Sequence, residues 1–185
     1  MAIGEGFDAL LVAAQRGEPS ALGALYRDLA PAVLGYLRGR GVPDPEDVAA
    51  EAFVHLVRSI ERFDGDEAGF RSFVFTIVHR RMLDAGRRAR RRLDEPWDTF
   101  ELAPAGPVAP AAEEEALDSL AAERAMRLLD GLTDDQRSVV LLRVLADLPV
   151  AEVARVLGKE PGAVKTLQRR ALASLARALV AEREP

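Results

Sequence analysis

The stretch VAEVARVLGKEPGAV, residues 150–164, carries the strongest structural signal in the chain. A helix-turn-helix requires a small residue where its two helices approach most closely, and Ala154 occupies that position. Four residues later, the turn requires a residue that tolerates a left-handed backbone, which Gly158 does without steric strain. Val164 and Leu167 then supply the side of the second helix that faces the first. The pattern predicts a helix-turn-helix.

The second helix of this motif has a basic outer face. Its polar and basic side chains suit the major groove of duplex DNA and the flanking phosphates. An ordinary two-helix corner could show the same small-residue pattern, but the basic face favours DNA. The residues expected to bind duplex DNA are Lys165, Thr166, Arg169 and Arg170.

A second basic block lies in the middle of the chain. Residues 80–92 hold seven arginines and one aspartate, whereas residues 93–123 hold nine acids and no base, within a net charge of −5. Arginines at this density repel one another unless an anionic partner or counterions offset their charge. A solvated helix face is the simpler interpretation, but the density of charge favours nucleic acid.

The residues that precede this block suggest how it is used. Phe70 and Phe73 share a helical face with Ile77, so most of the aromatic side chains here are expected in the core. The acidic, glycine-containing loop at residues 63–70 can approach an unstacked base closely. His79 is expected on the helix surface or at a phosphate. The residues expected to bind melted DNA are Asp66, Phe70, Arg80, Arg81, Arg87 and Arg88.

Helical periodicity dominates the rest of the chain, and strand alternation is nearly absent. We expect a helix at about residues 7–15, another that begins with Ser20 as N-cap, and a third with Asp44 as N-cap. A long helix is expected at about residues 70–92. Thr133 has the spacing of a capping box at the start of a later helix.

Residues 94–112 differ from the segments on either side. Four prolines, many alanines and several acids leave this segment little to pack, as is typical of a flexible linker. The sequence therefore predicts an all-α protein of two small helical domains, residues 1–93 and residues 113–185, joined by a flexible acidic linker at residues 94–112.

The composition excludes several classes of function. With 185 residues, 49% hydrophobic, the chain can form a packed core, and no apolar run is long enough for a membrane span. The acidic start of the chain does not fit a secretory signal. The absence of cysteine excludes disulfides, cysteine metal sites and thiol nucleophiles, and two histidines supply little acid–base chemistry. We expect a cytoplasmic protein that is not an enzyme and needs no cofactor or metal.

One acidic helix face has no place in this scheme yet. Asp44, Glu46, Asp47 and Glu51 lie opposite Phe53 on the expected helix. No nucleophile, glycine-rich phosphate loop or histidine partner accompanies them, so catalysis and Mg²⁺ binding are disfavoured. A protein-docking surface or a solvated face fits better, and Phe53 could equally belong to the core.

Together these parts resemble the extracytoplasmic-function (ECF) sigma factors, the compact group of bacterial RNA polymerase sigma subunits. Residues 25–31, LYRDLAP, are similar to the opening of their region 2. Residues 44–53, DPEDVAAEAF, are similar to the helix that docks on the clamp coiled coil of the largest polymerase subunit. Residues 63–84 are similar to the segment that melts and reads the downstream promoter element. Residues 132–137 and the helix-turn-helix resemble region 4.

The resemblance implies a sigma factor that binds core RNA polymerase and directs promoter-specific transcription initiation. Region 4 would read the upstream duplex element, and region 2 would capture the melted downstream element. Asp47, Glu51 and Phe53 would belong to the polymerase-docking surface, and the acidic linker would thread the channels of the polymerase. An anti-sigma factor is a typical further partner of such a protein.

The chain departs from the family pattern at several positions. Ala50, Phe73 and Arg80 stand where members usually carry Gln, Trp and Asn. In the recognition helix, Leu167 precedes Gln168, the reverse of the usual polar-then-apolar order. Arg80 would alter readout of the flipped downstream base and the reversed pair would rotate the base-reading face, so promoter preference cannot be copied from relatives.

Three other interpretations explain less of the sequence. A helix-turn-helix regulator with a partner-binding N-terminal domain accounts for residues 113–185 but not for the arginine block. A sigma-like decoy, which binds an anti-sigma factor and never touches DNA, is opposed by the seven arginines at residues 80–92. An enzyme has almost no support in the residues present.

Overall fold

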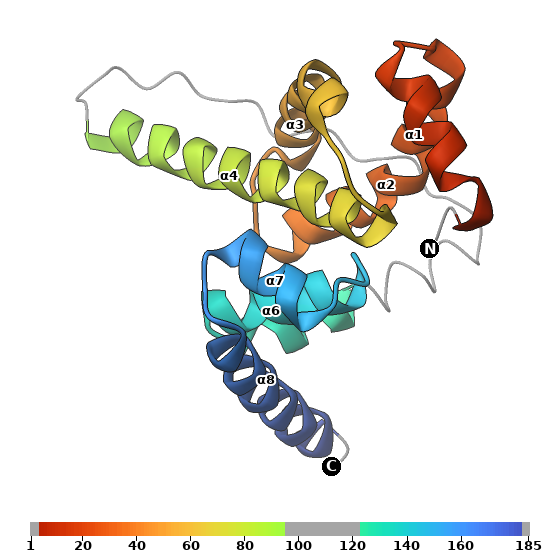
Figure 1. Cartoon of the computed structure of the whole chain (residues 1–185). Helices are drawn as coiled ribbons and strands as arrows, with labels where there is room; N and C mark the ends of the chain where they lie inside the picture. Colours follow the sequence, from red (N-terminus) through yellow and green to blue (C-terminus); the bar gives the residue numbers. More distant parts are fainter. Residues whose placement is uncertain (1–3, 95–122, 183–185) are drawn as a thin grey trace, which may run out of the picture.

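The computed structural model describes residues 4–94 and 123–182, and both parts are built of helices (Figure 1). The all-α prediction is confirmed, and no strand occurs in either part. The N-terminal domain, residues 4–94, contains α1 (Phe7–Gln15), α2 (Pro19–Gly39), α3 (Pro45–Ser59) and α4 (Glu67–Asp94), with short 3-10 helices at Gly4–Gly6 and Ile60–Arg62. The C-terminal domain, residues 123–182, contains a helical segment at residues 123–130, α6 (Asp134–Val144), α7 (Val150–Leu157) and α8 (Pro161–Ala181).

Local chemistry explains several helix ends. Thr133 and Gln136 form the predicted capping box, in which each side chain accepts a hydrogen bond from the other residue's backbone N–H. Gly158 ends α7 with φ 62° and ψ 37°, the left-handed geometry that the turn was expected to need. Asp44 precedes α3 as its N-cap residue but makes no side-chain capping hydrogen bond, and Pro45 occupies the first helical position.

The predicted start of α2 is wrong. Helix α2 begins at Pro19 with Glu18 as its N-cap residue, so Ser20 lies inside the first turn. The fixed φ of proline already suits the first helical position, and its missing N–H is not needed there. The proline therefore begins the helix two residues earlier than a serine cap at Ser20 would.

A buried ion-pair cluster fixes the start of α4 against α2. The Arg71 guanidinium donates hydrogen bonds to Asp28 Oδ2 at 3.1 Å and to Glu67 Oε1 at 3.0 Å. Its side chain is 7% exposed. A buried charge needs such partners, so this cluster positions α4 and the loop that precedes it.

The two domains pack directly against each other (Figure 1). Helix α4 lies against α7, and α2 lies against α6, so the buried apolar side chains of the two domains form one continuous cluster. The sequence predicted two domains joined by a linker and gave no signal for this contact. Except for Asp94, which ends α4, the expected linker at residues 94–112 lies outside the described residues. Helix α8 projects away from the packed body (Figure 1).

Candidate nucleic-acid interface

The helix-turn-helix forms as the sequence predicts. Ala154 is 4% exposed at the corner, and Lys159 donates its backbone N–H to the Ala154 carbonyl at 2.9 Å across the left-handed turn. Val164 on α8 is fully buried, and Leu167 packs against the same core. The inner side of α8 is thereby fixed on α7, and its opposite side faces outward.

The outward side of α8 carries the expected DNA-binding residues. Lys165, Arg169 and Arg170 are exposed. Thr166 is half-buried, and its hydroxyl donates to the Gly162 carbonyl at 3.0 Å within the helix. The structure therefore brings three cations together on one helix face, with Thr166 beside them.

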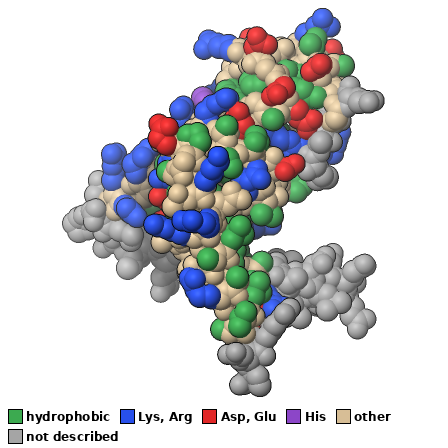
Figure 2. All heavy atoms as spheres, turned by 60° about the horizontal axis from the view of Figure 1, so that its bottom comes forward, with side chains coloured by type: hydrophobic (Ala, Val, Ile, Leu, Met, Phe, Trp, Pro, Cys, Tyr) green, Lys and Arg blue, Asp and Glu red, His purple; other side chains and the backbone are tan. Residues whose placement is uncertain are grey.

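The arginine block lies along the second half of α4. Arg80, Arg87 and Arg88 are exposed, and Arg81 is half-buried. Two of the arginines have acidic partners, because Arg87 pairs with Asp84 and Arg88 Nη2 lies 3.0 Å from Glu51 Oε2. Figure 2 shows that Lys and Arg side chains of the molecule spread over the face that comes forward when the view of Figure 1 is turned. The block therefore forms an exposed basic surface that local acids neutralise only in part.

The loop before α4 is ordered by Asp66 and by aromatic packing. Asp66 Oδ1 accepts a hydrogen bond from the Gly69 backbone N–H at 2.8 Å, which caps the helix. The Phe63 ring lies 5.2 Å from that of Phe70 and 5.4 Å from that of Phe73. Phe70 is only 1% exposed, which corrects the expectation that its side chain contacts DNA. Its role in this structure is to support the loop.

His79 also differs from its expected role. Burial and the positive charge of Arg40 lower the pKa of His79 to about 4, so the ring is neutral at pH 7. Its Nδ1 lies 2.7 Å from the hydroxyl of Tyr36, whose own pKa burial raises to about 12. Tyr36 also has a side-chain hydrogen bond with Ser138 of α6. A neutral ring engaged at the junction of the two domains is not a phosphate contact.

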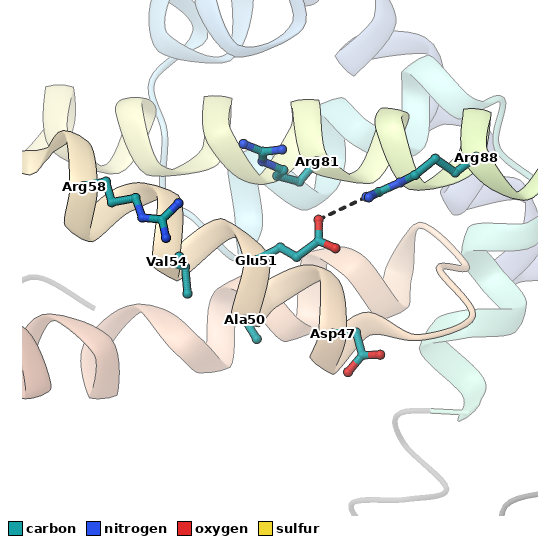
Figure 3. A pocket seen from close by; sticks show the side chains of 7 residues that line it. All are labelled: Asp47, Ala50, Glu51, Val54, Arg58, Arg81 and Arg88. Carbon is teal, nitrogen blue, oxygen red and sulfur yellow. Dashed lines mark hydrogen bonds and ion pairs between the residues drawn. The ribbon is translucent and has the colours of Figure 1, made fainter.

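The acidic face of α3 borders the arginine block (Figure 3). Asp47 and Glu51 are exposed, and Figure 3 shows Glu51 directed toward Arg88. Phe53 is half-buried, with its ring 4.7 Å from the exposed ring of Tyr26. An open groove of about 570 Å³ lies between the helices, lined by Asp47, Ala50, Glu51, Val54, Arg58, Arg81 and Arg88.

Sequence reasoning missed a hollow where the two domains meet. It has a volume of about 480 Å³ and combines the loop before α4 with side chains of α4 and α7. The α4 residues are Ser72, Phe73 and Thr76, and the α7 residues are Glu152 and Arg155. No spacing in the sequence relates residues 72–76 to residues 152–155, so only the packing of the domains reveals the site.

Two features are absent from residues 4–94 and 123–182. Within those ranges, no group of His, Asp or Glu side chains could hold a metal ion. Nor does any helix there have the length and apolar character needed to cross a membrane.

Comparison with known families identifies both domains. Residues 25–92 match the model of Sigma-70 region 2, and residues 122–175 match that of Sigma-70, region 4. The chain belongs to the sigma-70 family. The two regions occur in the order that the sequence analysis expected, and they account for α4 with its arginines and for the helix-turn-helix.

Individual relatives place the chain among the ECF sigma factors. It is 36% identical to the ECF RNA polymerase sigma factor BldN of Streptomyces coelicolor, over 92% of this chain and 64% of BldN. It is 34% identical to ShbA of Streptomyces griseus, over 90% of this chain and 92% of ShbA. The resemblance inferred from the motifs is therefore confirmed.

A solved relative has a similar fold. The structure of CnrH in complex with the cytosolic domain of CnrY superposes with a TM-score of 0.67 at 25% identity, over 94% of this chain and 96% of CnrH. The all-α arrangement of this sigma factor is therefore found in a second, distantly related protein.

Proposed function

We propose that this sigma factor binds core RNA polymerase and directs initiation at specific promoters, with α8 reading the upstream element as duplex. The observation that carries the proposal is the exposed cationic side of α8, formed by Lys165, Arg169 and Arg170 on a helix held by its inner face. Such a helix presents donors to base edges and phosphates in a major groove. Thr166 lies next to them.

The downstream element is assigned to the loop before α4 and to the arginines that follow. Asp66 fixes the loop, and Arg80, Arg81, Arg87 and Arg88 form the adjoining basic surface on α4. Melted DNA offers unstacked bases and a flexible phosphate backbone, which a loop and a row of cations can hold together. Phe70 contributes by supporting Phe63 rather than by touching a base.

The polymerase-docking surface is assigned to α3. Asp47 and Glu51 present exposed carboxylates, and the half-buried Phe53 ring is reachable beside Tyr26. A surface with acids around a partly exposed aromatic is suited to a protein partner with basic and apolar groups. Binding of this kind needs no catalytic group, and a protein that works with polymerase and promoter DNA belongs in the cytoplasm.

An anti-sigma factor is the further partner that we propose. The relative CnrH was solved in complex with the cytosolic domain of CnrY. The likeness of the fold over nearly the whole chain supports a comparable protein partner here.

Run-off transcription with purified core polymerase tests the proposed function. Core enzyme with the full chain should give a transcript from a specific start site, whereas core enzyme alone should not. A helix-turn-helix regulator would bind duplex DNA but give no such transcript. A decoy would give neither duplex binding nor a transcript, so the two alternatives are separable.

A further inference from the structure

The hollow at the domain junction lies over the loop that the proposed function assigns to melted DNA. One wall is formed by Phe63, Asp64 and Asp66 of the loop, together with Ser72 and Thr76 on α4. The facing wall belongs to α7 of the other domain, which supplies Glu152 and Arg155. A strand that approaches this part of the loop therefore meets α7.

The Glu152 carboxylate on this wall is held in an ion pair. Its side chain is 12% exposed, and Arg155 Nη1 lies 3.0 Å from Glu152 Oε2. That oxygen is buried and accepts no hydrogen bond of good geometry. Because the Arg155 side chain is 70% exposed and offsets the Glu152 charge, α7 excludes a strand by occupying the space beside the loop rather than by repelling phosphate.

Two glycines on α2 allow the other domain to come this close. A Cβ atom at Gly39 would lie 2.8 Å from both Cδ atoms of Leu141, and one at Gly35 would lie 3.1 Å from Leu145 Cδ1. Leu141 of α6 and Leu145, which follows that helix, therefore rest directly on the α2 backbone. At Gly35 no other residue has a heavy atom within 4 Å of that position, apart from the chain neighbours and the helix's own backbone, and at Gly39 the three nearest atoms all belong to Leu141.

A polar contact closes the same junction. Arg40, at the end of α2, donates from Nη1 to the backbone oxygen and to Oδ1 of Asp134, each at 3.0 Å. The Arg40 side chain is only 10% exposed, so this partner of the ion pair is largely buried. The leucine–glycine contacts and this partly buried ion pair thus both hold the two domains together.

We propose that the free protein holds itself closed, with α7 covering the single-strand site while the recognition helix α8 stays exposed. The two DNA-binding elements, α8 and the loop before α4, are then not equally accessible. Helix α8 can bind duplex at once, whereas the loop can bind a melted strand only after the domains separate. The inference relies on the proposed function only for the assignment of the loop to single-stranded DNA.

The glycines supply a test that leaves each domain intact. In the double variant Gly35→Gln/Gly39→Gln, each new side chain first meets a leucine of the other domain, Leu145 or Leu141, so the closed packing is lost while α2 keeps good helix formers. Gly23→Gln is the matched control on the same helix, because a Cβ there meets only the Arg27 side chain at 3.5 Å. Circular dichroism should show the same helix content in all three proteins.

Two measurements on the full chain decide the matter. Small-angle X-ray scattering should give a compact wild type and control, and a larger radius of gyration for the double variant. Fluorescence anisotropy with a single-stranded oligonucleotide of the downstream element should show roughly tenfold tighter binding by the double variant, as expected if about one wild-type molecule in ten is open.

Each contrary result overturns the inference. A wild type as extended as the double variant would mean that the free protein is not closed. An opened variant that binds the strand no better than wild type would mean that α7 does not control the site. Run-off transcription separates this from the proposed function, because a closed, compact wild type that yields no transcript would refute the function and not the closure.

Discussion

The recognition helix α8 and the loop before α4 are both assigned to promoter DNA, yet the structure presents them differently. The cations of α8 project into solvent from a helix that is held only on its inner side. The loop is walled by α7 of the other domain, with Glu152 at the junction. On the proposed assignments, the free protein can bind duplex as it is, whereas strand capture requires that the two domains separate.

The largest effect is expected at the exposed recognition helix, α8. The variant Lys165→Ala/Arg169→Ala/Arg170→Ala should lose at least about a hundredfold in affinity for upstream duplex, because one base-reading arginine is worth about 1–3 kcal/mol. Electrophoretic mobility shift at fixed salt measures this loss. Arg177→Ala, which removes an exposed arginine farther along α8, is the control and should bind nearly as wild type does.

Equal duplex binding by the triple variant and wild type would show that these cations of α8 do not bind the upstream element. The folded state should be unaffected in either case, because all three side chains are exposed. Circular dichroism checks that condition.

A smaller effect is expected at the proposed strand-binding surface of α4. Arg87→Ala/Arg88→Ala should reduce open-complex formation on duplex promoter, and a promoter with a pre-melted bubble should restore much of it. Loss of two phosphate contacts should also flatten the salt dependence of strand binding by about 1.4 in log–log slope. Permanganate reactivity of unpaired thymines gives the direct readout.

Normal melting by this variant would leave the arginines as a solvated helix face. Arg38→Ala is a suitable control, since Arg38 is an exposed arginine on α2 with an acidic partner, Glu46, outside the block. It should melt the promoter as wild type does.

Short-range sequence patterns predicted most of the helices and turns. The different exposure of α8 and of the loop before α4 follows from long-range packing, which those patterns do not reveal. The capping box at Thr133 and the left-handed turn at Gly158 act over a few residues, so spacing alone reveals them. Gly35 and Gly39 contact leucines about a hundred positions later in the chain. A glycine within a helix does not indicate in the sequence which residue packs against it. The same reason explains why Phe70 looked available in the sequence and is buried in the structure.

Acid should weaken the closed junction. His79 is surrounded by Tyr36, Arg40, Asp135 and Lys159, and its pKa is lowered from 6.5 to about 4. The neutral ring favours the folded state above pH 6.5, and that stability is lost progressively as the pH falls from about 6.5 to about 4. After allowance for its partial exposure, about 1 kcal/mol should disappear between pH 7 and pH 5.

Urea unfolding at the two pH values measures this change, with scattering to follow compaction. His79→Gln keeps a hydrogen-bonding group near Tyr36 but cannot titrate, so its pH dependence should be flatter than that of wild type. Identical pH dependence in the two proteins would show that carboxylates, rather than His79, govern the acid response.

The smallest effect is expected at the ion pair that joins the docking helix to the arginine block. Glu51 and Arg88 are both about half exposed, with side-chain exposures of 48% and 53%, so a double-mutant cycle with Glu51→Gln and Arg88→Gln should give a coupling below about 1 kcal/mol in urea unfolding. The buried Arg71 cluster is the contrasting case, where loss of Asp28 should be strongly destabilising because it removes one of the two carboxylates that balance a buried guanidinium. Under the proposed function, a weak pair would let Arg88 turn to a DNA strand while Glu51 contacts the polymerase. A coupling above about 2 kcal/mol would instead make Arg88 a structural residue, beyond what an exposed pair supplies, and would remove it from the strand-binding surface.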